Sequence, residues 1–269
     1  LLEAGQAVRA ADIDPLAIPE RLAPEVAAVR FDFTDAATWP AAFRGVDVMF
    51  LMRPPQLSNI ARDMVPALEA ARAAGVGHIV LLSLQGAEHA RVVPHAKIEA
   101  WLRDSGLAWT FVRPSFFMEN LSTTHAPDIR DRDAIIVPAG SGRTAFVAAS
   151  DIAEVAAAAL LDPAAHRNRA WTPTGPEALT YDEVAAILTD TLGRPIRYAH
   201  PGVLRYLPHA IRELGMPPAM ALVTTAIYTV ARLGKAAGLT DDVRTVTGHG
   251  PVALTDWAKE HRAAWERRG

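Results

Sequence analysis

The sequence predicts an α/β fold, a doubly wound parallel sheet followed by a small, mostly helical C-terminal cap. Five apolar runs, each five to eight residues long and suited to a buried strand, alternate with amphipathic helical segments up to residue 112. Strands that alternate with helices pair in parallel through right-handed crossovers, which puts helices on both faces of the sheet. From about residue 173 the chain is helical and rich in proline, so we expect these residues to pack as a cap rather than as an independent domain.

The expected elements follow one another along the chain. The strands cover residues 7–12, 26–33, 46–52, 79–83 and 108–112. Helices are expected at residues 59–74 and 94–105, because each segment has apolar residues at helical spacing and is followed by a glycine. After Pro114 we expect short strands at 134–138 and 144–147 around a glycine turn at 140–142, then helices at 151–161 and 181–192.

Composition excludes several classes of partner. The net charge is −3, from 27 Lys and Arg against 30 Asp and Glu, and the basic residues are scattered, so we expect no nucleic acid partner. The longest nearly uncharged stretch, residues 216–230, contains two prolines and is too short to span a bilayer. The absence of cysteine excludes disulfides and fits a cytoplasmic protein. The nine histidines show no ligand spacing, so we expect no metal.

Seven segments carry a resemblance to a known family. They are residues 32–35 (DFTD), 45–48 (GVDV), 51–55 (LMRPP), 75–80 (GVGHIV), 105–110 (SGLAWT), 113–120 (RPSFFMEN) and 150–155 (SDIAEV). Their order and strand endings resemble the short-chain dehydrogenase superfamily, and within it the atypical NmrA-like branch with its triphenylmethane-reductase-like and quinone-reductase-like proteins. The resemblance covers nearly the whole chain. It implies a dinucleotide-binding Rossmann-like domain at residues 1–172 and a substrate cap at residues 173–269.

The family opens with a strand, a GxxGxxG turn and a helix whose amino end binds the cofactor pyrophosphate. This chain contains no such glycine pattern. We expect the natural protein to carry this segment, of about 20 residues, ahead of Leu1, where it supplies the central strand of a 3-2-1-4-5 order. The alternative is a natural protein that has dispensed with it. The chain alone is expected to bind a dinucleotide weakly, because the backbone donors of the turn are missing.

The resemblance places the cofactor along the carboxyl ends of the strands. Asp12 ends the second family strand, where an acid binds both ribose hydroxyls and repels a 2′-phosphate, so NAD is favoured over NADP. Many relatives carry an arginine at the next position, which is Ile13 here. A turn residue at Asp12, a turn cap at Asp32 and a solvated charge at Arg53 are the alternatives. The expected cofactor contacts are Asp12, Asp32, Phe33, Met52, Arg53, Pro54, Ser83, Lys97 and Pro114.

Ser83 and Lys97 match the positions of the catalytic serine and lysine of the superfamily. The catalytic tyrosine is missing, because Val93 stands four residues before Lys97, on the same helical face. His95 cannot simply replace the tyrosine, since two residues are about 200° around a helix. We assign substrate contacts to His95, Phe116, Phe117 and Met118. Strand-end hydrogen bonding for Ser83, a helix-start role for His95 and core packing for the three apolar residues remain alternatives.

Three functions follow from this pattern. The first is an NAD(P)H-dependent reductase that transfers hydride to a quinone-like or other conjugated acceptor, while water or Ser83 supplies the proton. The second is an NmrA-like sensor that binds the dinucleotide and reports to a protein partner without turnover. The third is a truncated homologue that binds no cofactor. A small-molecule substrate is expected in the first case, and a homodimer is left open.

Overall fold

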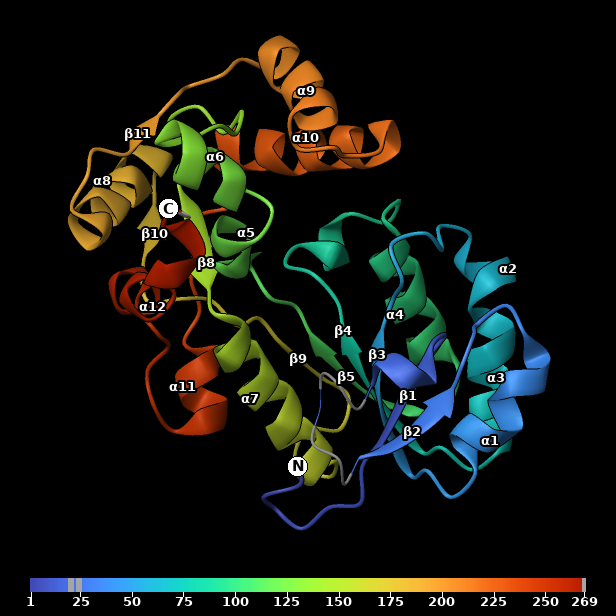
Figure 1. Ribbon diagram of the computed structural model, residues 1–269. Coiled ribbons are helices and arrows are strands. Elements are labelled where there is room, and N and C mark those ends of the chain that lie inside the picture. Colours follow the sequence, from blue (N-terminus) through green and yellow to red (C-terminus); the bar gives the residue numbers. More distant parts are fainter. Residues whose placement is uncertain (19–21, 23–25, 268–269) are drawn as a thin grey trace. The chain divides into compact units, whose positions relative to one another are not determined.

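The computed structural model describes residues 1–18, 22 and 26–267, and its elements are labelled in Figure 1. Contacts divide the chain into two compact units. Unit 1 consists of Leu1–Arg113 and Glu154–Trp171, and unit 2 of Pro114–Ala153 and Thr172–Gly269. The last change from unit 1 to unit 2 follows Trp171, one residue before the domain boundary that the sequence analysis expected between residues 172 and 173. The structure also groups Pro114–Ala153 with the C-terminal part, where the sequence analysis had placed these residues in the first domain.

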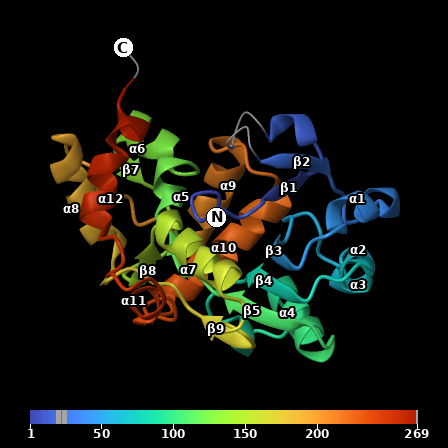
Figure 2. The same ribbon diagram turned by 90° about the horizontal axis from the view of Figure 1, so that it is seen from below.

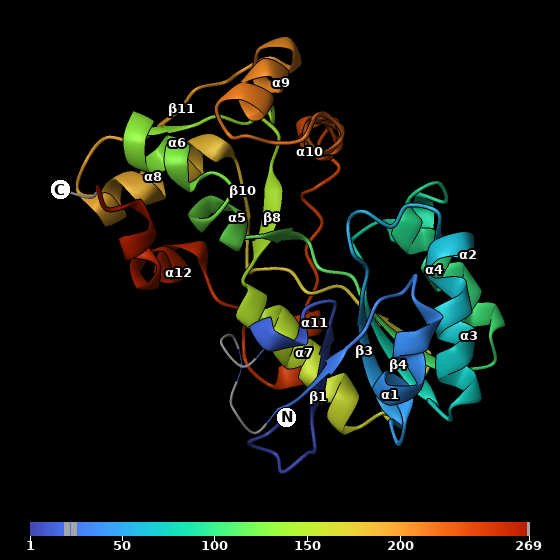
Figure 3. The same cartoon turned by 45° about the vertical axis from the view of Figure 1, so that its right-hand side comes forward.

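The main sheet of unit 1 is parallel throughout, which confirms the expected α/β class. Its strands are β3 (Val48–Met52), β4 (His78–Leu82), β5 (Ala108–Val112) and β9 (Arg169–Trp171), hydrogen-bonded in the order β3-β4-β5-β9. Helices α2 (Ile60–Asp63), α3 (Val65–Ala73) and α4 (Pro94–Asp104) pack beside one face of this sheet (Figure 3). Residues on β4 that point to this face, Ile79 and Leu81, are fully buried in the core of unit 1.

Two further strands of unit 1 form a sheet of their own. β1 (Arg9–Asp12) pairs in parallel with β2 (Ala27–Arg30), and Asp12 stands beside Arg30 in this ladder. Figure 2 shows the strands succeeding one another in the order β2, β1, β3, β4, β5, β9. Among the described strands no ladder joins β1 to β3. The family order expected from the sequence has its central strand between these two positions.

The helix expected at residues 59–74 is divided at Met64 into α2 and α3. Pro66 explains the division. Proline has no backbone N–H to donate to the carbonyl of Arg62, four residues earlier, so it is accommodated in the first turn of a new helix, where no such donor is needed. Both parts still bury the apolar face predicted from the spacing, since Ile60, Met64, Leu68 and Ala71 are nearly or fully inaccessible.

Unit 2 is built around two small sheets. β8 (Thr144–Val147) pairs with β10 (Ala178–Leu179) on one side and with β6 (Phe116–Phe117) on the other, and β7 (Ala134–Ile135) pairs with β11 (Arg197–Tyr198). The helices that begin in this unit are α5 (Glu119–Ser122), α6 (Ala126–Arg132), α7 (Ala149–Leu161), α8 (Tyr181–Leu192), α9 (Val203–Arg212), α10 (Pro218–Arg232), α11 (Asp242–Thr247) and α12 (Leu254–Glu260). Those that begin after residue 173, α8 to α12, agree with the helical character expected there.

Each unit has its own hydrophobic core. In unit 2 the core collects all four tyrosines of the chain, Tyr181, Tyr198, Tyr206 and Tyr228, which lie ring against ring. The remaining short elements are helix α1 (Trp39–Phe43) and four 3-10 turns, Pro15–Ala17, Ala36–Thr38, Ala87–His89 and Arg262–Trp265. Within the described residues, no helix combines the length and the apolar character that crossing a membrane requires.

Candidate cofactor and active site

Polar side chains gather at the carboxyl edge of the main sheet in unit 1. Arg53 follows β3, Ser83 follows β4 and Arg113 follows β5. Because the three strands are parallel neighbours, their carboxyl ends lie at one edge, which is where α/β sheets bind ligands. Helix α4 begins at the same edge and contributes two further polar residues, His95 and Lys97, within its first turn.

Glu99 of α4 connects these strand ends. Its side chain is 0% exposed. Oε1 accepts hydrogen bonds from Oγ of Ser83 at 2.7 Å and from Nε of Arg113 at 2.9 Å. Oε2 accepts from the other arm of Arg113 at 2.6 Å and from Arg103 at 2.9 Å. The charged carboxylate is thus fully hydrogen-bonded, as a buried charge must be.

The protonation state of Glu99 follows from this environment. Burial alone raises the pKa of the Glu99 carboxyl, but the hydrogen bonds from Arg113 and Ser83 and the charges of Arg113 and Arg103 outweigh burial, so its pKa lies below the ordinary value. Glu99 is therefore ionised at neutral pH and accepts hydrogen bonds only. Arg113 also approaches the half-exposed carboxylate of Glu88 at 3.2 Å.

The position of Ser83 limits what it can do. Its backbone N–H donates to the carbonyl of Val112 at 2.7 Å, and its hydroxyl hydrogen is committed to Glu99. The hydroxyl oxygen can still accept a hydrogen bond from a ligand. Sequence reasoning missed Glu99. The one signal available was an acid placed between the core positions Ile98 and Leu102, on a helix otherwise read for its apolar spacing.

Lys97 and His95 differ in their surroundings. Lys97 is exposed, and among the described residues its ammonium group has no hydrogen-bond or ion-pair partner. Val93, the residue four positions earlier, is the extended residue directly before α4 and offers no hydroxyl. Burial, and next the charge of Arg53, lower the pKa of His95 to about 4. Lys97 thus offers its ammonium group to a ligand, and His95 is an uncharged ring at neutral pH.

Arg53 shapes the loop after β3. One nitrogen of its guanidinium donates to the carbonyl groups of Pro54 at 2.9 Å, Pro55 at 3.1 Å and Leu57 at 2.9 Å. Its Nε is buried and has no hydrogen-bond partner among the described residues, and burial lowers its pKa. Arg53 is therefore bound to its own loop rather than fully solvated. Met52, the last residue of β3, has 63% of its surface exposed, and Pro54 is half-buried.

The residues expected near the adenosine part lie at the ends of β1 and β2. Oδ1 of Asp12 accepts the backbone N–H of Asp14 at 3.0 Å, so Asp12 does begin the turn that the sequence analysis considered. Asp32 likewise caps a turn, since Oδ1 accepts the N–H of Thr34 at 2.7 Å, and these hydrogen bonds lower its pKa. Phe33 is half-buried with its ring edge-on to Phe31. Asp12 caps the turn with only one carboxylate oxygen, so its other oxygen is available to a ligand.

The other expected site residues belong to unit 2. Phe116 and Phe117 form β6 and are half-buried, and the ring of Phe116 lies 6.1 Å from that of Tyr228. Met118 is only 1% exposed and belongs to the core cluster. Pro114 is buried. In unit 2 the two phenylalanines therefore keep accessible surface, and Met118 does not.

Comparison with known proteins supports the same family that the motifs indicated. The family model described as "NmrA-like family" matches residues 15–248. An NAD(P)H azoreductase from Xenophilus azovorans is 37% identical, over 87% of this chain and 82% of the relative. A (4-alkanoyl-5-oxo-2,5-dihydrofuran-3-yl)methyl phosphate reductase from Streptomyces griseus is 35% identical, over 96% of this chain and 93% of the relative.

The fold is shared with a solved structure. An NADPH-dependent quinone oxidoreductase from Escherichia coli, crystallised with NADPH, superposes with a TM-score of 0.84 at 24% identity, over 95% of this chain and 90% of that one. This likeness agrees with the parallel α/β architecture described above. The chain belongs to the NmrA-like family, within a group that includes NAD(P)H-dependent oxidoreductases.

Proposed function

We propose that the protein reduces a conjugated acceptor, such as a quinone or an azo compound, by hydride transfer from a nicotinamide cofactor, with water supplying the proton. One observation carries this proposal. The strand edge of unit 1 offers a cation, Lys97, and a hydrogen-bond acceptor, Ser83, but the described residues there place no free hydroxyl in the position of the family tyrosine, because residue 93 is Val and the hydrogen of Ser83 is held by Glu99.

The type of acceptor follows from the missing phenol at position 93. Reducing a simple ketone, or oxidising the alcohol, requires a proton transfer in step with the hydride, and a positioned acid or base typically contributes ~10²–10⁴ in rate. A conjugated acceptor needs less help, since the added hydride leaves a delocalised anion. The ammonium of Lys97 would stabilise that negative charge. His95 is neutral at pH 7 and would contribute contact rather than a proton.

The residues of unit 1 fit a dinucleotide in part. The exposed ammonium of Lys97, the free oxygen of Ser83 and the second oxygen of Asp12 suit the hydroxyl, amide and phosphate groups of such a molecule. When bound, the reduced nicotinamide supplies the hydride. The 269 residues contain no GxxGxxG turn for the pyrophosphate, so the expected contacts lie on the nicotinamide and adenosine sides.

The relatives support a conjugated acceptor. An azoreductase acts on a nitrogen–nitrogen double bond, and the dihydrofuran named in the second relative carries carbonyl groups beside its ring double bond. Both are extended π systems that accept hydride readily. These two names come from the relatives with 37% and 35% identity, so we carry the class of acceptor, rather than either compound, to this protein.

Nucleotide oxidation with a panel of acceptors tests the proposal. NADH or NADPH is mixed with the protein and with a benzoquinone, a naphthoquinone or a monoazo dye, and absorbance at the nicotinamide band is followed. We expect enzyme-dependent turnover with at least one of these acceptors. Tight dinucleotide binding with no turnover on any of them would instead support the sensor function, for which the missing tyrosine is also an argument.

A further inference from the structure

A pocket in unit 2 lies outside everything assigned so far. It is lined by Gly202, Val203, Leu204 and Arg205 at the start of α9 and by Arg232 at the end of α10. Its volume is about 490 Å³, which is within the range of small-molecule sites. Because all five lining residues belong to unit 2, the pocket is defined within that unit.

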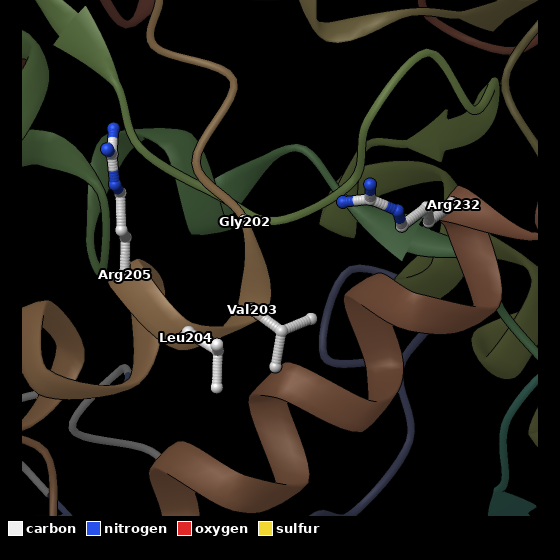
Figure 4. A pocket seen from close by; sticks show the side chains of 5 residues that line it. All are labelled: Gly202, Val203, Leu204, Arg205 and Arg232. Carbon is white, nitrogen blue, oxygen red and sulfur yellow. The ribbon is translucent and has the colours of Figure 1, made fainter.

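The pocket has a charged side and an apolar side. Figure 4 shows the guanidinium of Arg232 reaching from the end of α10 toward Gly202, and that of Arg205 on the other side of Gly202. The side chains of Val203 and Leu204 point away from both guanidinium groups. Leu204 is 90% exposed. An apolar surface of this kind beside two cations matches a ligand with an alkyl part and a negative charge.

Neither arginine is neutralised by an acid. Among the described residues, no carboxylate lies within ion-pair distance of Arg205 or Arg232, and neither guanidinium has a hydrogen-bond partner. Asp182, whose charge acts on Tyr198 together with that of Arg232, is hydrogen-bonded to His200 at 2.9 Å. Other surface arginines of this unit do have acidic partners, for example Arg143 with Glu183 at 2.8 Å.

The glycine turn of residues 140–142 explains why Arg232 stands where it does. A Cβ at Gly142 would lie 1.9 Å from the carbonyl oxygen of Ala231, so only glycine lets the turn approach the last turn of α10. A Cβ at Gly140, whose φ is +59°, would lie 3.2 Å from Cγ of Arg232. The turn therefore packs directly on the arginine stem and restricts the directions that its side chain can take.

Helix α10 carries further exposed apolar side chains. Leu222, Val223, Ile227, Val230 and Leu233 are all substantially exposed on or just after this helix. Contiguous exposed apolar surface on a soluble protein commonly marks a binding site. An alkyl chain of a ligand whose anionic end lies between the two arginines could extend over Leu204 and these residues.

We propose that this pocket binds a small amphipathic anion, a phosphate or carboxylate group on an alkyl chain, with the anion between Arg205 and Arg232 and the chain on Leu204. Guanidinium groups bind both phosphates and carboxylates by paired hydrogen bonds. The site uses none of the residues assigned above to the cofactor or to the substrate, so its ligand can be tested apart from the proposed reductase activity. It adds a second ligand to the protein beyond the nicotinamide cofactor.

Calorimetric titration without any nucleotide tests the site. The probes are decyl phosphate and decanoate below their micelle concentrations, and the two reference compounds are inorganic phosphate and decanol. We expect one or both charged amphiphiles to bind at least about tenfold more tightly than either reference compound, and more weakly as NaCl is raised. The head group that binds more tightly identifies the source as a phosphate ester or a carboxylic acid.

Substitutions distinguish binding at this pocket from nonspecific binding elsewhere on the protein. Arg232→Gln and Arg205→Gln should each weaken binding by roughly fivefold, as expected for loss of one exposed charge pair. Arg212→Gln is the matched control, since Arg212 is exposed on α9, the helix of Arg205, and does not line the pocket. All three variants should keep the parent melting temperature.

Two binding results would overturn the proposal, and a light-scattering result would do so too. One is unchanged affinity in the double variant of Arg205 and Arg232, and the other is decanol binding as tightly as decyl phosphate. Light scattering on the same samples tests whether a second copy of the chain, rather than a small ligand, covers this surface. If the protein forms a dimer that Leu204→Ser dissociates, and no probe binds, then the apolar surface contacts a second copy of the chain and the proposal is wrong.

Discussion

Ser83 and Glu99 are joined by a 2.7 Å hydrogen bond between the end of β4 and the middle of α4. The same carboxylate also holds Arg113 at the end of β5. One buried acid therefore positions the residue that the family resemblance marks as catalytic, together with the residue that follows the neighbouring strand. This arrangement makes Glu99 the side chain on which the geometry of the strand edge depends.

Replacing Glu99 should destabilise unit 1 strongly. Glu99→Ala leaves Arg113, whose side chain is 10% exposed, with only the half-exposed Glu88 as partner. Removing one partner of a buried ion pair costs about 3–5 kcal/mol. Urea denaturation at pH 7 measures this loss. Glu69→Ala is the control, because Glu69 pairs with Arg72 at the surface of α3, where such pairs contribute about 1 kcal/mol or less. An equal loss of unfolding free energy in the two variants would mean that the buried ion pair of Glu99 contributes no more to stability than a surface pair does.

Replacing Ser83 should have a modest effect on reduction. Ser83→Ala removes one of the hydrogen bonds to Glu99 but leaves those from Arg113 and Arg103 in place. Because water can supply the proton, we expect the rate of quinone reduction to fall by less than about tenfold. Steady-state kinetics on the purified variant gives this ratio. A loss beyond a hundredfold would show that the serine takes part in proton transfer.

The pH dependence of stability should carry the signature of His95. Burial and Arg53 lower its pKa to about 4 in the folded protein, against about 6.5 in the unfolded chain. Between these values the unfolded state binds more protons, so the stability falls as the pH is lowered from 6.5 toward 4, by up to about 1.4 kcal/mol per pH unit from this group.

Urea midpoints at pH 7.5, 6 and 5 check this contribution. His95→Asn should reduce the slope, while the parent slope also contains His125, which is fully buried and has its pKa lowered to about 4 in the same direction. An identical slope in parent and variant would show that the environment of His95 is more polar than its burial implies.

Much of the fold was predictable because its strands and helices repeat a clear pattern. The strand at residues 108–112 was predicted with the bounds of β5, and α4 ends one residue before its expected end. The two-residue strands β6 and β10 and the three-residue β9 were not predicted, since so few residues show no periodicity. The structure has two separate sheets, β1-β2 and β3-β4-β5-β9, and the break between β1 and β3 falls where the sequence analysis placed the missing central strand.

The site was harder to predict, for a physical reason. Motif resemblance selected Ser83 and Lys97 by their order in the chain. The burial of Glu99 depends on Arg113, 14 residues away and on another element, and a single sequence does not display such a contact. The same limit applies to Arg30, which only the ladder between β1 and β2 places beside Asp12.

Asp12 and Arg30 together make the choice of nucleotide testable. We expect NADH to bind more tightly than NADPH, because Asp12 repels a 2′-phosphate and Arg30 lies 4.0 Å from the carboxylate of Asp35. Asp12→Asn should narrow the difference between the two dissociation constants, measured by fluorescence titration. If NADPH binds more tightly and Arg30→Gln abolishes that preference, Arg30 rather than Asp12 determines the choice.

The most direct test of the proposed reaction is the ratio of two catalytic efficiencies of the purified protein. One is kcat/KM for quinone or azo-dye reduction by NADH or NADPH, and the other is kcat/KM for oxidation of simple secondary alcohols by the oxidised nucleotides. With Val93 four residues before Lys97 and no phenol at that position, we expect reduction to exceed alcohol oxidation by at least about a hundredfold. Comparable efficiencies, or faster alcohol oxidation, would contradict the account, and His95 would then be the first residue to examine as the base.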